Sequence, residues 1–401
     1  MKIGIITPAD LPVPAVLGGA IETLIDNFIK ENEKQGLFDL VVYSKYHDRA
    51  AGESKKYTKA RFNWIRENGG YRIISFLFRI LRKIGITKTL YDVWLVYRFI
   101  KKDHPDVILV EGNPAYVKYL KKRLDRGCRI LFHIHALLNE GKYGYLSDAF
   151  EFSDQIIVVS EYIKSNLLHR FKININKVNV VFNCVNEIYF EKAGSVNNNI
   201  SLKKSLGLEQ GDFVLIFAGR LVPEKGLLEL VKACKLLKNK ITFKLIIAGS
   251  FGSDFGKTNS GPNPFKEIIQ TEIRDNETDF RFCGYVSNDS LVGYYACADL
   301  AIFPSITEEA AGLVAIEAMA LSLPVIYSNK GGIPEYVSPK CGIMVDMGAE
   351  NCIGQIADAI LTLHDNSEMR KSMSSASLQN AKRFTPKKYF ENLSECINLS
   401  I

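Results

Sequence analysis

The chain lacks the features that would cross-link it or anchor it through a bilayer. Its eight cysteines are scattered, with no CxxC pair and no histidine cluster beside them, so we expect reduced thiols rather than a disulfide framework or a zinc site. The strand-like run from Lys2 to Thr7 is followed by prolines, which is not the pattern of a signal peptide. No apolar run reaches the roughly 18 residues of a membrane-spanning helix. We therefore expect a cytoplasmic protein, with peripheral attachment to the inner face of the plasma membrane as a further possibility.

The composition is that of an ordinary globular protein, with 47% hydrophobic and 24% charged residues. A length of 401 residues exceeds one ordinary domain and suits two of about 200 residues each. In both halves, apolar strand-like runs alternate with helical stretches, a pattern that predicts two mainly parallel, doubly wound sheets. Two such Rossmann-like domains would face each other across a cleft at the carboxyl ends of their strands.

The expected elements can be placed along the chain. The predicted strands are 2–6, 40–43, 107–110, 130–134 and 155–159 in the first half, and 213–218, 243–248, 280–283, 300–303, 325–327 and 342–345 in the second. Helices are predicted at 22–33, 116–124 and 386–399. The segment 187–211 has the least pattern and is the predicted linker.

Positive charge is concentrated in the window from Lys55 to Lys102. It holds thirteen Lys and Arg against two acidic residues, a net charge of +11 in a chain of only +7, and both tryptophans. Basic and apolar residues mixed in this way suit an anionic membrane surface. Two ordinary domain helices with a solvated basic side are an equal alternative. Nucleic acid is a third and less favoured partner.

The segment from Asp299 to Val337 carries the most chemical information. A buried strand at 300–303 is followed by a loop that holds Glu309 and then by a helix over 312–319 that carries Glu317. The backbone N–H groups near Gly312 should therefore lie at a helix N-terminus, where phosphate is the natural ligand. The two carboxylates are eight positions apart, so we expect them to contact different parts of one elongated ligand. Taken alone, they could instead complement the helix dipole and face solvent.

These residues resemble those of a known family. Glu309 and Glu317, Pro324-Val325 and Gly331-Gly332-Ile333-Pro334-Glu335 are similar to the hallmark of retaining glycosyltransferases of family 4, the sucrose-synthase and mannosyltransferase-like group, here of the bacterial cell-surface polysaccharide type. Residues 219–226, GRLVPEKG, resemble the diphosphate-binding segment of that family, and Gly18-Gly19 resemble its N-terminal glycine loop. The resemblance covers nearly the whole chain and implies the GT-B fold. It further implies an acceptor domain at 1–188, a donor domain at 189–383, and a helix at 384–401 that crosses back to the first domain.

The resemblance also implies a role for each candidate residue. Arg220 and Lys225 would bind the diphosphate, Glu317 the ribose, and Glu309 the donor sugar, whose developing positive charge it would help to stabilise. The donor site is completed, by the same resemblance, by Gly18, Gly19, Gly249, Ser250, Tyr285, Val286, Gly312, Leu313 and Val314. His135 would contact the donor sugar. His133 precedes it by two positions, and we expect one of the pair to face the cleft or both to straddle it. With fixed cations and a helix start available for the phosphates, we expect neither a metal ion nor a cofactor.

The expected function is transfer of a hexosyl unit from a nucleotide sugar, taken to be a UDP-sugar, to a glycan or lipid-linked acceptor. A non-catalytic nucleotide-sugar-binding subunit and a nucleic-acid glucosyltransferase are the alternatives. The chain departs from the family pattern at Ala310 and Ala311, where glycine and phenylalanine are usual, at Ser322, where glycine is common, and at Cys184. The two alanines should alter the wall beside the donor sugar, so they affect the donor identity more than the activity.

Overall fold

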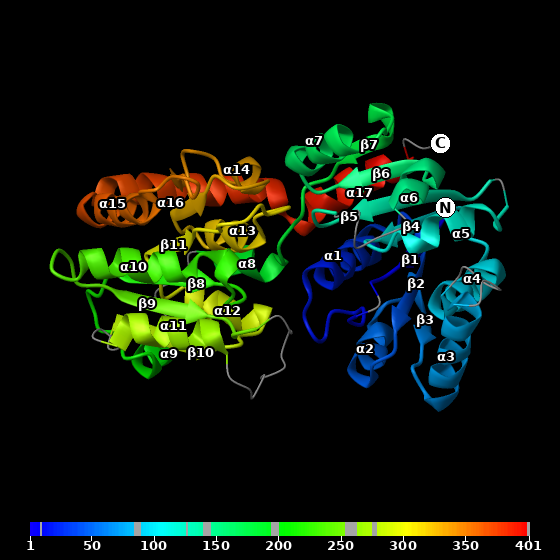
Figure 1. Ribbon diagram of the computed structural model, residues 1–401, viewed down its shortest axis with the longest axis horizontal. Helices are drawn as coiled ribbons and strands as arrows, with labels where there is room; N and C mark the ends of the chain where they lie inside the picture. The colour runs from blue at the N-terminus through cyan, green and yellow to red at the C-terminus, as the bar shows by residue number, and fades with distance from the viewer. Residues whose placement is uncertain are drawn as a thin grey trace. The chain divides into compact units, whose positions relative to one another are not determined.

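The structure is a computed structural model that describes residues 1–8, 10–83, 90–125, 127–138, 146–193, 200–252, 263–274 and 279–398 (Figure 1). The chain divides into two compact units. Unit 1 contains Met1–Asn183 together with Pro386–Ile401, and unit 2 contains Cys184–Thr385. Each unit is built around one parallel sheet.

Unit 1 has a seven-stranded sheet in the order β3-β2-β1-β4-β5-β6-β7. Its strands are β1 (Lys2–Ile6), β2 (Asp39–Lys45), β3 (Ala60–Ile65), β4 (Val107–Glu111), β5 (Arg129–Ile134), β6 (Gln155–Val158) and β7 (Val178–Val180). Its helices are α1 (Ala20–Gln35), α2 (Asp48–Glu53), α3 (Gly69–Lys83), α4 (Tyr91–Asp103), α5 (Ala115–Lys121), α6 (Leu146–Phe152), α7 (Glu161–Arg170) and α17 (Pro386–Asn398). The central strands β4 and β5 are almost completely buried and mostly apolar, because helices cover both faces of a doubly wound parallel sheet.

Helix α17 belongs to unit 1 although it follows unit 2 in the sequence. It packs against α1, where the ring of Phe390 lies 4.9 Å from that of Phe28 and 6.1 Å from that of Phe38. All three rings are buried. This aromatic cluster fastens the end of the chain to the first helix.

Unit 2 has a six-stranded sheet in the order β10-β9-β8-β11-β12-β13. Its strands are β8 (Val214–Ala218), β9 (Lys244–Ala248), β10 (Phe280–Gly284), β11 (Leu300–Phe303), β12 (Val325–Ser328) and β13 (Gly342–Val345). Its helices are α8 (Glu187–Glu191), α9 (Ile200–Ser205), α10 (Leu227–Leu237), α11 (Pro264–Ile273), α12 (Asn288–Tyr295), α13 (Leu313–Ala320), α14 (Ile333–Tyr336), α15 (Cys352–Asp365) and α16 (Ser367–Ala381). Side chains of α10, α11 and α15 form one core with the sheet.

The segment predicted to be a linker carries two short helices, α8 and α9, while residues 194–199 lie outside the described part of the chain. Tyr189 of α8 is buried in unit 2, and its hydroxyl donates to the backbone oxygen of Asn288 at 3.2 Å. The start of the segment is therefore part of the packed unit. None of the described helices is both long and apolar enough to span a bilayer.

Candidate active site

The candidate site of unit 2 lies where the order of its strands reverses. Strands β8 and β11 are neighbours in the sheet, and the connections from them run to opposite sides. Such a switch point leaves the two following loops side by side at the carboxyl ends of the strands, which is where open α/β sheets bind ligands. One loop runs from Gly219 to Gly226, and the other from Pro304 to Gly312.

Glycines allow these loops to approach closely. A Cβ atom on Gly226 would lie 1.9 Å from the carbonyl oxygen of Pro304, and the residue has a φ of 74°. The backbone N–H of Ile306 donates to the oxygen of Glu224 at 2.9 Å. On the other side, the N–H of Gly332 donates to the oxygen of Glu309 at 2.7 Å. The loop that carries Glu309 is therefore held from both sides.

This arrangement brings Lys225 and Glu309 together in an ion pair. Both side chains keep partial exposure, 25% for Lys225 and 20% for Glu309, so a ligand can reach them. Ser305, which no sequence motif indicated, donates from Oγ to Glu309 Oε1 at 2.9 Å. Arg220 is exposed on the same loop, with no ion pair to any residue in the described ranges. The site thus presents a cation and a carboxylate at one point and a second cation beside it.

Helix α13 begins at this site. Gly312 is its N-cap and supplies no side-chain cap, so Leu313 and Val314 open the helix with main-chain donors at the loop. Glu317 lies on the next turn and is half-buried rather than solvated. Tyr295, from α12, donates from its hydroxyl to Glu317 Oε2 at 3.2 Å, and Tyr189 also hydrogen-bonds to this carboxylate. Burial raises the pKa of Glu317 to about 7, and the two hydroxyls offset only part of that effect.

The remaining candidates of unit 2 surround the ends of β9 and β10. Gly249 follows β9, and a Cβ there would lie 1.8 Å from the carbonyl oxygen of Gly219, so only glycine fits between the two loops. Ser250 accepts a hydrogen bond at its backbone oxygen from Leu221 N at 3.0 Å. Tyr285 is 51% exposed and is therefore not a core residue, and Val286 is half-buried.

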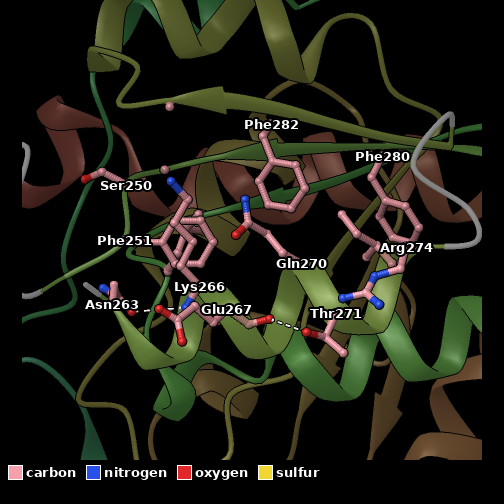
Figure 2. A pocket seen from close by; sticks show the side chains of 14 residues that line it. Ser250, Phe251, Asn263, Lys266, Glu267, Gln270, Thr271, Arg274, Phe280 and Phe282 are labelled. Carbon is pink, nitrogen blue, oxygen red and sulfur yellow. Dashed lines mark hydrogen bonds between the residues drawn. The ribbon is translucent and has the colours of Figure 1, made fainter. Parts of the chain in front are cut away.

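A pocket of about 920 Å³ opens between α11 and β10 (Figure 2). Gly249, Ser250 and Gly284 line it together with the rings of Phe251 and Phe282, whereas neither Lys225 nor Glu309 does. Figure 2 shows Phe282 above Gln270 of α11, and Phe280 beside Arg274. The pocket is therefore next to the strand ends of the candidate site but separate from its ion pair.

In unit 1 the glycine loop leads directly into α1. Gly18 and Gly19 have φ values of 78° and 96°. A Cβ on Gly19 would lie 2.1 Å from Oε2 of Glu22, whose carboxyl is buried in the first turn of the helix. Burial raises the pKa of Glu22 to about 7, and the carboxylates of Asp10 and Glu111 raise it further. Several acidic groups therefore gather at this edge of the sheet.

His135 follows β5, and His133 lies two positions before it, within the strand. Residues i and i+2 of a strand point to the same side, and both rings lie against Glu111, the last residue of β4. His135 Nε2 is 2.6 Å from Glu111 Oε2. Burial lowers the pKa of His135 to about 4, with a further contribution from His133, so the ring is neutral at neutral pH. The contacts with both histidines hold the pKa of Glu111 below its ordinary value despite its burial.

Comparison with known proteins identifies the family of this chain. The model of "Glycosyltransferase Family 4" matches residues 18–187, and that of "Glycosyl transferases group 1" matches residues 198–380. The chain belongs to the group 1 glycosyltransferases of family 4. HepE of Anabaena, solved in complex with UDP, aligns over 100% of both chains with a TM-score of 0.76 at 17% identity, and this likeness confirms the predicted GT-B fold.

Two curated relatives illustrate the sequence similarity. A lipopolysaccharide 1,2-N-acetylglucosaminetransferase of Salmonella typhimurium is 34% identical over 35% of this chain and 36% of its own length. The capsular polysaccharide biosynthesis glycosyltransferase CapM of Staphylococcus aureus is 29% identical over 51% of this chain and 52% of its own length. The chain thus spans about a third to a half of the length of these relatives.

Proposed function

We propose that the protein is a retaining hexosyltransferase that uses a UDP-sugar and extends a glycan or lipid-linked acceptor in cell-surface polysaccharide synthesis. The observation that carries this proposal is the Lys225–Glu309 pair at the switch point of unit 2. Transfer from a nucleotide sugar releases a diphosphate, so negative charge grows on the leaving oxygen while positive charge grows on the sugar. A lysine and a carboxylate in contact can stabilise both changes at adjacent positions.

The proposed roles are those that the resemblance implies, and the positions of the residues in unit 2 support them. Lys225 and Arg220 bind the diphosphate together with the start of α13 at Gly312, Leu313 and Val314. Glu309 contacts the sugar, and Glu317 accepts hydrogen bonds from the ribose hydroxyls. The donor phosphates then need no metal ion.

The rest of the donor is assigned to neighbouring loops. The base lies at the mouth of the pocket, where Gly249, Ser250, Tyr285 and Val286 frame it. For unit 1, the proposed contacts are those of Gly18 and Gly19 with a phosphate and that of His135 with a sugar. The names of the relatives support this assignment, since one structural relative was solved with UDP and two curated relatives act in lipopolysaccharide and capsule synthesis.

The test is turnover of a panel of UDP-sugars and GDP-sugars by the full chain, with donor binding measured separately by calorimetry. Glu309→Gln should lower kcat by at least about a hundredfold while leaving the donor Kd within a few-fold. Glu308→Gln, an exposed neighbour, is the matched control and should retain activity. Binding without turnover in the unmodified protein would favour the non-catalytic subunit instead.

We further propose that helix α3 contacts an anionic membrane surface. Its inner side packs on α4, where the rings of Tyr71 and Phe78 lie 5.2 Å and 5.3 Å from that of Tyr91. Its outer side leaves Ile73 64% exposed and Phe76 57% exposed. Exposed apolar residues of this size, beside basic ones on the same helix, are typical of a helix that lies in an anionic lipid surface.

Vesicle flotation tests this surface. The full chain should bind vesicles that contain an anionic lipid, and the double change Ile73→Ser, Phe76→Ser should reduce binding by at least about tenfold because both side chains would otherwise enter the bilayer. Leu236→Ser, which replaces a similarly exposed residue of unit 2, is the control. Equal binding of the double variant and the control would show that α3 is not the membrane contact. Lys88, part of the basic window, lies outside the described residues.

A further inference from the structure

Three side chains with metal-binding atoms meet at the carboxyl edge of the sheet in unit 1. Glu111 ends β4 and pairs in register with His133 of β5, and His135 follows on the same side. Oε2 of Glu111 is 2.6 Å from Nε2 of His135 and 3.1 Å from Nδ1 of His133. The possible ligand atoms of the three residues all lie within 4.8 Å of one another.

Several polar atoms of this cluster have no hydrogen-bond partner among the described residues. His133 is completely buried, yet neither of its ring nitrogens has a hydrogen-bond partner there, and the same holds for Nδ1 of His135. The 3.1 Å approach of His133 Nδ1 to Glu111 is too poorly aligned to be a hydrogen bond. A buried polar atom without a partner destabilises the folded state. A ligand between the three side chains would bond to Nδ1 of His133 and so remove the destabilisation for this atom.

We propose that Glu111, His133 and His135 bind one divalent first-row transition-metal ion, with Zn²⁺ as the best-suited example. Metal–nitrogen and metal–oxygen distances of about 2.0–2.2 Å place neighbouring ligand atoms of a tetrahedral site about 3.3–3.6 Å apart. The ligand atoms of the three residues lie within 4.8 Å of one another, so small side-chain movements would suffice. Two imidazoles and one carboxylate suit these ions, whereas Ca²⁺ and Mg²⁺ prefer oxygen ligands.

The surroundings complement a cation. Glu22 is buried near enough to Glu111 for their charges to interact, and Asp10 acts on Glu22 in the same way. The bound ion would offset this excess of negative charge. The metal site does not depend on the sugar contact proposed for His135.

The experiment measures metal binding by the full chain with its sequence unchanged. The protein carries no histidine tag, and a chelator first removes any bound metal. Addition of Co²⁺ should produce visible d–d absorption that saturates at one equivalent, and Zn²⁺ should displace it. Zn²⁺ should also raise the thermal midpoint, because a ligand that binds only the folded state stabilises it.

Three variants test whether the metal binds at the proposed residues. Glu111→Gln and His133→Gln should each weaken Co²⁺ binding by at least about tenfold. His169→Gln, which changes an exposed histidine, should bind as the unmodified chain does. Circular dichroism without metal checks that each variant is folded. Absence of stoichiometric Co²⁺ and Zn²⁺ binding by the unmodified chain, or equal binding by folded Glu111→Gln, overturns the proposal.

Discussion

Replacing Glu317 by Gln should make the protein more stable at alkaline pH and a poorer binder of its donor. The substitution keeps the size of the side chain and its ability to accept a hydrogen bond from Tyr295. It removes the ionisable group whose pKa burial raises from 4.5 to about 7. The effect on stability should therefore depend on pH in a way that ordinary packing damage does not.

The sign follows from proton linkage. Because the folded state holds the Glu317 proton more tightly than the unfolded chain does, this residue contributes its full stability below the unfolded pKa of 4.5 and loses it as the pH rises through about 7. The loss is at most about 3 kcal/mol, since one pKa unit corresponds to about 1.4 kcal/mol. Glutamine suffers no such loss. In a unit of this size, the variant should melt about 5–10 °C higher at about pH 8, with little difference near pH 5.

Thermal unfolding of both proteins across this pH range measures the difference. Glu368→Gln is the control, because that carboxyl is exposed and Lys371 lowers its pKa. Calorimetry with the nucleotide should show affinity reduced by about tenfold in the Glu317 variant, because a hydrogen bond to a charged acceptor is stronger than one to an amide. A gap in melting temperature that does not grow with pH would refute the reasoning.

Three further substitutions test the packing. Gly226→Ala should separate the two loops of the candidate site, because its Cβ would lie 1.9 Å from the oxygen of Pro304. We expect calorimetry to show loss of donor binding and urea unfolding to show a destabilisation of about 1–3 kcal/mol. Ser322→Gly should raise the free energy of unfolding by about 1 kcal/mol, since the φ of 64° at Ser322 is strained for serine but not for glycine. An unchanged urea midpoint would count against this expectation. Phe390→Ala should lower the free energy of unfolding by about 3–5 kcal/mol, because the contact with Phe28 is lost. A change below about 1 kcal/mol would contradict the described packing of α17.

Most of the strands, though not the edge strands β3 and β7, could be predicted closely because buried parallel strands are continuous apolar runs. β11 and β13 occupy the predicted residues, and β8 starts one residue later than predicted. The placement of Lys225 beside Glu309 follows from the same pattern, since each residue follows a strand and the two strands are neighbours. Ser322, noted as a departure from the family, has the backbone conformation that explains why glycine is common there.

Other parts of the site depend on contacts between distant residues and carry no local signal. Glu111 is 22 positions from His133, and only the register of β4 with β5 brings them together. The hydroxyls of Tyr189 and Tyr295 reach Glu317 from two different helices. The composition around α3 likewise indicated a basic aromatic surface, but which side chains are exposed depends on how the helix packs against α4.

The position of α17 affects the order in which the protein can fold during synthesis. The ribosome releases this helix only after the whole of unit 2, so the nascent unit 1 must wait without its final helix. During that interval Phe28 and Phe38 lack the ring of Phe390 that covers them in the finished protein. Unit 2 is continuous in sequence and can complete its fold first, although it is translated second. Any pause between the translation of unit 2 and that of α17 would therefore prolong exposure of an aromatic surface on α1, as exposed apolar surface of this kind makes a nascent chain prone to aggregation.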